Sequence, residues 1–229
     1  MTTENSSATA DVETAGRTLQ VVFTPDAGPL LAGGPAYLDG VVSLGMGDPV
    51  GLLASAARAT GRSREYTFTA DGPDGAPLRD PFADAVEIGG IETSRPLTTN
   101  APVTEHLLLN QFLTLEDLRD GIPDGHAADL VLECSRMLRL EGVPQQDAPR
   151  ATAAVHLLIR RDDAALASYY RQQADAVMAA KQFDVVREQR LVELFSARNE
   201  LARDALSSLT DHPDGYVAAR ARQALAALG

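Results

Sequence analysis

The chain has 229 residues, of which 45% are hydrophobic, and this is enough for one or two domains with a real core. Its formal net charge is −12, and the charge is unevenly distributed. Residues 1–159 carry 22 acidic and 10 basic side chains, whereas residues 160–229 carry 10 of each. A strongly acidic region repels phosphate groups, so nonspecific binding to nucleic acid or to anionic membranes is disfavoured there.

The sequence also suggests where the protein resides. It contains no apolar run of membrane-spanning length. Residues Met1–Gly16 are rich in Thr, Ser, Ala and Glu and lack the basic and apolar regions of a signal peptide. We therefore expect a cytoplasmic protein with a disordered tail over residues 1–16 and no membrane contact.

Four stretches of the first ninety residues have the pattern of strands. Apolar and polar residues alternate, or an apolar run is bounded by turn residues such as Gly, Pro and Asp. The stretches are Thr18–Thr24, Tyr37–Leu44, Arg64–Ala70 and Ala83–Ile91. We expect a strand-rich part that ends near residue 92.

A short helix is predicted after the second of these stretches. Asp48 is a suitable N-cap, and Pro49 suits the first helical position because its missing N–H would be unpaired there anyway. Gly61 can end this helix. Its apolar side consists of Leu52, Leu53, Ala56 and Ala57.

The glycines ahead of this helix form the one candidate cofactor site. Gly45-x-Gly47-x-x-x-Gly51 stands between a strand and a helix, and Asp71 follows about twenty residues later. A dinucleotide-binding unit has this outline, because glycines let a pyrophosphate approach a helix N-terminus while an acid binds a ribose hydroxyl. However, Asp48 places a carboxylate where the phosphates would lie. The other interpretation is a plain glycine turn and no cofactor.

The stretch Leu19–Leu44 resembles the start of RAMP-type (Cas5/Cas7-like) CRISPR subunits. The resemblance rests on the first strand, the turn residues Gly28-Pro29-Leu30-Leu31 and Gly33-Gly34, and the run Tyr37-Leu38-Asp39-Gly40-Val41-Val42. In that family a ferredoxin-like strand leads through a Gly-rich turn into a Leu-Asp-Gly helix. The resemblance implies a non-catalytic backbone subunit that binds guide RNA. It covers 26 of the 229 residues and lacks a recognisable C-terminal glycine-rich loop.

Residues 104–141 are predicted to be mainly helical. Thr104 can cap a helix that runs through Phe112, and Thr114-Leu-Glu-Asp117 is a capping box that opens a short one. A third helix is expected from Asp124 or Gly125 to Glu141, with Gly142 behind it. The later run Val155–Ile159 fits a strand or a helix start equally well.

The last third of the chain has the strongest helical pattern. Asp162 can cap a helix to about Ala180, and Lys181–Asp184 is the expected break before the next helix. The proline-containing turn Asp211–Gly215 stops that long helix, and a final one runs over Tyr216–Leu228. The apolar stripe of the long helix consists of Leu191, Leu194, Leu201, Ala202, Ala205, Leu206 and Leu209.

No catalytic or metal-binding motif is visible. The four histidines show no H-x-x-x-H or H-E-x-x-H spacing, and no nucleophile elbow or P-loop is present. Asp71, Asp74 and Asp80 lack the spacing of an EF-hand. The single cysteine, Cys134, excludes an intrachain disulfide and is interpreted as a core residue. We assign no catalytic and no metal-binding residue. The sequence leaves the question of an enzyme open and favours a non-catalytic protein; the alternative is a nucleotide- or cofactor-binding enzyme that uses the Gly45-x-Gly47-x-x-x-Gly51 turn.

The sequence therefore predicts an α+β fold with a strand-rich N-terminal part, ferredoxin-like or a small mixed sheet, followed by a mainly helical part. The expected domains are an α+β domain over residues 17–160 and a helical bundle over residues 161–229. The expected function is a non-catalytic interaction or structural subunit of a larger cytoplasmic assembly. It would contact a protein partner or a second copy through the C-terminal helices, and RNA only if the CRISPR resemblance holds. Whether Arg58, Arg62, Arg64 and Arg79 meet on one surface stays open.

Overall fold

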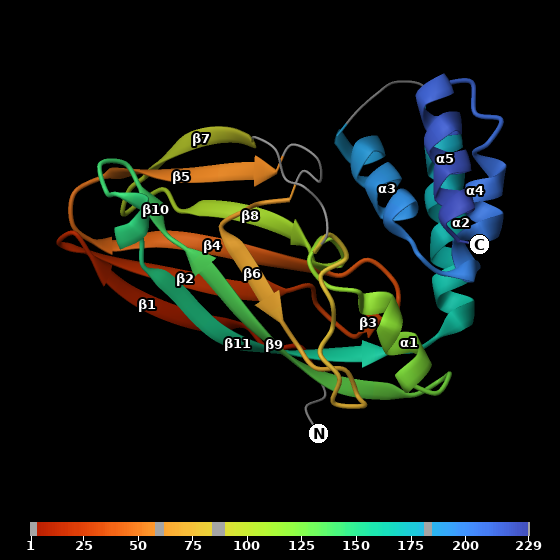
Figure 1. Ribbon diagram of the computed structural model, residues 1–229, viewed down its shortest axis with the longest axis horizontal. Coiled ribbons are helices and arrows are strands. Elements are labelled where there is room, and N and C mark those ends of the chain that lie inside the picture. The colour runs from red at the N-terminus through yellow and green to blue at the C-terminus, as the bar shows by residue number, and fades with distance from the viewer. Residues whose placement is uncertain (1–3, 58–61, 84–89, 181–184, 229) are drawn as a thin grey trace. The chain divides into compact units, whose positions relative to one another are not determined.

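The computed structural model describes residues 4–57, 62–83, 90–180 and 185–228 (Figure 1). The chain divides into two compact units. The first, which we name the sandwich unit, comprises residues 1–30, 36–114 and 128–159. The second, the helical unit, comprises residues 31–35, 115–127 and 160–229.

Most of the sandwich unit consists of two four-stranded sheets. One has the order β1-β2-β4-β8, formed by Ala8–Thr14, Arg17–Pro25, Tyr37–Met46 and Val103–Leu108. The other has the order β3-β11-β9-β6, formed by Leu30–Leu31, Arg150–Arg160, Ala127–Met137 and Tyr66–Thr69. A smaller sheet has the order β10-β5-β7, formed by Arg139–Leu140, Val50–Ala57 and Gly90–Leu97.

The core of the sandwich unit follows from the two-residue period of its strands. In β2 the inward residues Leu19, Val21 and Phe23 are fully buried, and alternating residues of β9 and β11 are buried likewise. The two large sheets face each other, because the Phe23 ring of β2 lies 6.4 Å from the Tyr66 ring of β6 in an edge-on contact. Apolar burial between two sheets is what stabilises such a layered arrangement.

The helical unit is built from short helices around an apolar cluster. The helices are α1 (Leu118–Gly121), α2 (Asp163–Ala179), α3 (Val185–Ser196), α4 (Arg203–Ser208) and α5 (Gly215–Ala227). Single 3-10 turns cover Leu115–Asp117 and Glu200–Ala202 in this unit, and Leu109–Gln111 and Gln145–Asp147 in the sandwich unit. The cluster includes Leu166, Val177, Leu194, Leu206 and Val217, all of them buried.

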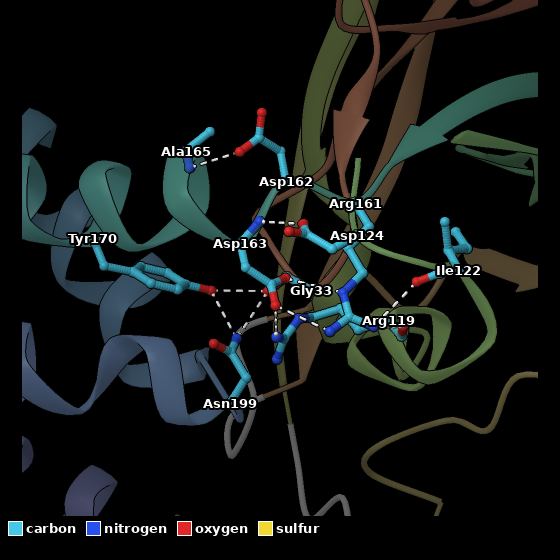
Figure 2. A network of polar contacts seen from close by, with 10 residues as sticks. All are labelled: Gly33, Arg119, Ile122, Asp124, Arg161, Asp162, Asp163, Ala165, Tyr170 and Asn199. Atoms are coloured by element: carbon cyan, nitrogen blue, oxygen red, sulfur yellow. Dashed lines mark hydrogen bonds and ion pairs between the residues drawn. The ribbon is translucent and has the colours of Figure 1, made fainter. Parts of the chain in front are cut away.

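A polar network fixes the start of α2 within the helical unit (Figure 2). Asp163 accepts hydrogen bonds from Arg119 at 3.0 Å and from two guanidinium nitrogens of Arg161 at 3.0 and 3.1 Å. Arg161 also donates to the carbonyl oxygens of Arg119 and Ile122 at 2.8 and 3.1 Å. These bonds tie the start of α2 to the segment that carries α1.

The same view shows a second polar contact deeper in the unit. Tyr170 and Asn199 both donate to the carbonyl oxygen of Gly33, at 2.8 and 3.2 Å. Asn199 also donates to the Tyr170 hydroxyl at 3.1 Å. A buried carbonyl group needs such partners, so this contact holds residues 31–35 against α2 and the start of the 200–202 turn.

The predicted fold class is wrong in its arrangement of elements. Strands do not end near residue 92 but continue through β8, β9, β10 and β11 to Arg160. A ferredoxin-like part would place helices between its strands, whereas strands β1 to β8 follow one another in the described residues without any helix. The helices of more than four residues lie after residue 160.

Three predicted helices are wrong. Residues 48–57 form a turn and strand β5, because Gly47 turns the chain with a φ of 111° and β5 then pairs with β7 and β10. The helix expected from Thr104 is strand β8 followed by one 3-10 turn. The helix expected from Asp124 is strands β9 and β10, because residues 130, 132, 134 and 136 are inward with period two.

Other boundaries also differ. The tail predicted over residues 1–16 contains β1, which pairs with β2 along its whole length. Val155–Ile159 belongs to a strand, β11. The predicted strand Ala83–Ile91 falls mostly outside the described residues, and β7 occupies Gly90–Leu97 instead.

The predicted C-terminal helices are confirmed in part. Asp162 caps α2 by accepting from the Ala165 N–H at 2.9 Å, and Asp214 caps α5 by accepting from the Tyr216 N–H at 3.0 Å. The long helix expected up to Leu209 is interrupted at Asn199, whose backbone is extended. The predicted break at Lys181–Asp184 lies outside the described residues. No helix among the described residues has both the length and the apolar character needed to cross a bilayer.

Candidate interaction cleft

The predicted glycine turn does not lead into a helix. Gly45 lies in β4, Gly47 in the connection after it, and Gly51 in strand β5, so no helix N-terminus is available there to receive a pyrophosphate. A Cβ at Gly51 would clash with the carboxyl group of Glu141 and would lie 2.5 Å from Ser94 Oγ. This glycine thus makes room for neighbouring side chains. Asp71 forms an isolated bridge with Pro77 in the turn after β6.

The titratable residues singled out in the sequence have local partners. His106 lies 2.6 Å from Asp39 and stacks on the Tyr37 ring. Cys134 is a free, buried thiol, as expected, and burial raises its pKa to about 12. A thiol with so high a pKa is a poor nucleophile. Among the described residues no group of three or more side chains is placed to hold a metal ion.

The sandwich unit has an open sheet edge at β6. This strand ends the sheet β3-β11-β9-β6. Because the N–H of Met137 donates to the carbonyl of Glu65, the residues that bond to β9 are 65, 67 and 69. The backbone groups of Tyr66 and Phe68 therefore point away from β9, out of the sheet. At the next outward position the Ala70 carbonyl accepts from the Leu78 N–H at 2.9 Å.

A hollow of about 670 Å³ lies along this open edge. It is lined by residues 62–64 and 66–69 together with Leu78, Asp80, Phe112 and Leu113. The volume falls within the range of ordinary ligand pockets. Tyr66 and Phe68, whose backbone groups point outward, are 4% and 5% exposed, and both line this hollow. The outward backbone of β6 therefore borders a space large enough for an added segment of chain.

A second hollow, of about 460 Å³, lies along the edge of the opposite sheet. It follows β8, the last strand of the sheet β1-β2-β4-β8, and includes residues 104–108. The two hollows share Arg62, Ser63 and Phe112 in their linings. We name the two together the edge cleft.

Arg62 holds the middle of the edge cleft. Its Nη1 lies 2.7 and 2.8 Å from the two carboxylate oxygens of Asp80 and 3.3 Å from the carbonyl oxygen of Gln111. Its guanidinium also lies over the rings of Phe82 and Phe112, at 5.8 and 5.7 Å from their centroids. The sequence left open whether these arginines meet on one surface. Arg62 and Arg64 do, because both line the larger hollow, whereas Arg58 lies outside the described residues.

A buried ionic network supports the cleft from beneath. Arg136 of β9 is 0% exposed, donates to the Tyr66 hydroxyl at 2.8 Å and forms an ion pair with Glu105 of β8 at 2.8 Å. Tyr66 in turn donates to the Glu105 carboxylate at 2.9 Å. Burial raises the pKa of Tyr66 well above its ordinary value, so the hydroxyl stays protonated as the donor in this network. The network joins the two sheets directly behind the open edges.

A second buried carboxylate fixes the segment that enters β6. Glu65 is 1% exposed and accepts from the backbone N–H of Ser55 and from the hydroxyls of Ser55 and Ser63. Arg139 forms an ion pair with it at 3.3 Å. A buried carboxylate with several donors is well satisfied, and it anchors residues 63–65 to strand β5.

The chemistry of the edge cleft suits binding better than catalysis. Its charged residues Arg62, Asp80 and Glu105 are engaged with protein partners, while the backbone groups that point outward from β6 can form hydrogen bonds with an added strand. Sequence reasoning missed this site because an edge position depends on the order of strands in a sheet. The available local signal was the alternation of Tyr66–Thr69 directly after a polar segment.

Comparisons with known proteins add no assignment. No family model, no curated protein and no solved structure matches the chain.

Proposed function

We propose that the chain is a non-catalytic interaction protein of a larger assembly, and that its edge cleft receives an extended segment of a protein partner. The observation that carries this proposal is the open edge of β6, whose outward backbone groups face the 670 Å³ hollow. Strand addition to an exposed sheet edge is a common mode of peptide recognition, in which main-chain hydrogen bonds provide the affinity.

The added strand has a defined position. Leu78 already pairs with Ala70, so the incoming backbone continues that line and pairs with Phe68 and Tyr66. The chain of this protein leaves the line after Leu78, because the carbonyl of Arg79 accepts instead from the Thr114 N–H at 2.9 Å. The hollow then occupies the place of the missing strand.

The side chains of the cleft favour an alternating sequence in the partner. Side chains on one face of the added strand meet Phe68, Phe112 and Leu113, which are buried and apolar. Side chains on the other face lie beside Thr67 and Thr69, which are exposed. A partner segment with alternating apolar and polar residues therefore fits best.

The other functions expected from the sequence stay predictions. The cofactor alternative has lost its geometric basis, because β5 stands where its helix was expected. The RNA-binding alternative predicts that gently purified protein carries stoichiometric RNA, so a native mass measured with and without ribonuclease tests it. The cytoplasmic location is likewise untested.

Binding of defined peptides tests strand addition. The probe is a synthetic library of capped heptapeptides with alternating apolar and polar positions, measured by fluorescence anisotropy against the full chain. We expect binders whose affinity falls at least about tenfold when the amides that face β6 are N-methylated, because each lost main-chain bond removes affinity. N-methylation of the intervening amides, which face solvent, is the matched control and leaves affinity nearly unchanged.

Two protein variants test whether the peptides bind at the edge of β6. Leu78→Arg fills the hollow with a charged side chain and is expected to abolish peptide binding. Val131→Arg, on an exposed position of β9, makes the same kind of change away from the cleft and retains it. Equal binding by both variants, or binding that ignores the N-methylation pattern, would disprove strand addition at β6.

A further inference from the structure

The helical unit presents an exposed mixed surface along α3 and α5, which we name the α3–α5 face. It consists of Glu188, Val192 and Phe195 on α3 and Tyr216 and Arg220 on α5. Tyr216 is 59% exposed and Val192 is 42% exposed, and both rank among the few large hydrophobic side chains that the described residues expose. Aromatic residues and arginine are the types enriched at the centres of protein interfaces.

Two contacts set the alignment of these helices. Arg187 near the start of α3 forms an ion pair with Asp214, the N-cap of α5, at 2.9 Å. Further along, the Arg220 guanidinium lies 5.7 Å from the centre of the Phe195 ring. The two helices therefore run in the same direction from the same end, and Tyr216 and Val192 both lie between the two contacts.

The two charged residues of the face lie at diagonally opposite corners, Glu188 on α3 and Arg220 on α5. Glu188 is one residue past Arg187 on α3, while Arg220 on α5 is level with Phe195. Seven residues separate Glu188 from Phe195, which is about 10 Å along a helix. The face thus has an acid at one corner, a base at the diagonal corner, and apolar side chains between them.

We propose that a second copy of the chain binds this face, in a two-fold symmetric dimer. A two-fold axis that lies in the plane of the face, along the diagonal from Phe195 to Tyr216, turns a second copy over onto the first, so that the two charged corners exchange places. Arg220 of each copy then lies opposite Glu188 of the other, and the aromatic residues Phe195 and Tyr216 near the axis lie opposite their own counterparts. A two-fold interface requires this kind of self-complementarity. A partner of a single charge sign would leave one of the two corners unmatched.

The dimer is tested by sedimentation of the full chain between 1 and 100 μM. We expect a reversible, concentration-dependent rise from 24.3 kDa towards twice that mass. Glu188→Arg and Arg220→Glu each place like charges opposite one another and are expected to weaken the dimer at least about tenfold. The double variant exchanges the two charges and restores dimerisation to within about threefold of the natural chain.

Arg222→Glu is the matched control, because Arg222 is exposed on α5 and lies outside the face. It reverses one charge and leaves the dimer constant nearly unchanged. Circular dichroism of every variant verifies that its helices are intact. A chain that stays at 24.3 kDa throughout, or single variants that dimerise as well as the natural chain, or a double variant without recovery, would overturn the proposal. The peptide experiment at β6 is independent of all these outcomes.

Discussion

The two units of this protein differ in how deeply they bury their ion pairs. The sandwich unit buries Arg136 and Glu65 almost completely and pairs each with an oppositely charged residue from a distant part of the chain, Arg136 with Glu105 and Glu65 with Arg139. In the helical unit the ion pairs Arg161–Asp163 and Arg203–Glu200 are partly or largely exposed and join residues close in sequence, whereas the pair Arg187–Asp214 has a buried arginine. Its core cluster consists mainly of apolar side chains, and the unit also buries four polar or charged ones: Arg187, Glu193, Asn199 and His212.

This difference has an energetic meaning. A buried charge depends on its partner, since the loss of the partner leaves an uncompensated charge in a medium of low polarity. An exposed ion pair contributes little, because water screens it and solvates either partner alone. Single substitutions should therefore have large effects in the sandwich unit and small ones at the polar groups of the helical unit.

The largest effect is expected for Arg136→Met. It leaves Glu105 and the Tyr66 hydroxyl without their buried cation, and should lower the free energy of unfolding of the sandwich unit by about 3–5 kcal/mol. Hydrogen exchange with mass spectrometry measures this on peptides of β4 and β9, separately from the helices. Adding Glu105→Gln removes the stranded charge and should recover part of the loss. A double variant as unstable as the single one would contradict the network.

Gly40→Ala should have the next largest effect. Gly40 lies in β4 opposite Tyr66, and a Cβ there would clash with the Tyr66 hydroxyl and lie 3.0 Å from its ring. Because that ring is held by Glu105 and Arg136, we expect a cost of about 1–3 kcal/mol, measured by exchange in the same peptides. Gly45→Ala in the same strand is the control, since its Cβ meets only the Thr18 carbonyl oxygen at 3.5 Å. Equal costs at both positions would show that Tyr66 is free to move.

Asp162→Ala tests the local interactions of the helical unit. It removes the side-chain acceptor of the Ala165 N–H at the start of α2 and should cost about 1 kcal/mol. Thermal unfolding followed by circular dichroism at 222 nm reports on it. Asp175→Ala changes an exposed aspartate within the same helix and should leave the transition almost unmoved. A loss as large as that of Arg136→Met would contradict the contrast between the units.

Ala15→Asn should stabilise the sandwich unit. Ala15 has a φ of 46° in the two-residue turn between β1 and β2, a conformation that costs an alanine more than an asparagine. Asn-Gly is the preferred pair for such a turn, so we expect a gain of about 0.5–1 kcal/mol in the exchange of β1 and β2. Ala154→Asn at an exposed strand position of β11 is the control and should bring no gain.

The same division explains which parts of the fold could be predicted. The start of α2 was visible because Asp162 acts on an N–H group three residues away, and the start of α5 because the proline-containing turn Asp211–Gly215 precedes it. Strand β9 was read as a helix because Leu130, Val131, Met137 and Leu138 recur at helical spacing. Its true pattern places Cys134 and the charged Arg136 at inward positions, which conceals the two-residue period of a strand.

The candidate site was beyond sequence reasoning for a related reason. That β6 is an edge strand follows from the sheet order, which no local pattern determines. Glu105 and Arg136 were invisible as partners because they are 31 residues apart in different sheets. The glycines that suggested a cofactor site are explained by packing, since Gly51 leaves room for Glu141 and Ser94.

The smallest expected effect is the response of the helical unit to acid. Hydrogen bonds from Arg161 and Arg119 hold the pKa of Asp163 below its ordinary value. A carboxyl group with a lowered pKa stabilises the folded state above its unfolded pKa, and this contribution is lost as the pH falls through the folded value. Melting at 222 nm should therefore shift downward on acidification below about pH 5 and stay flat from there to neutrality. Asp163→Asn cannot lose a charge, so its melting temperature should depend less on pH, although Asp214, whose pKa is lowered by Arg187, retains its share. An unchanged pH dependence in this variant would show that the network in Figure 2 aligns α2 without contributing to its acid stability.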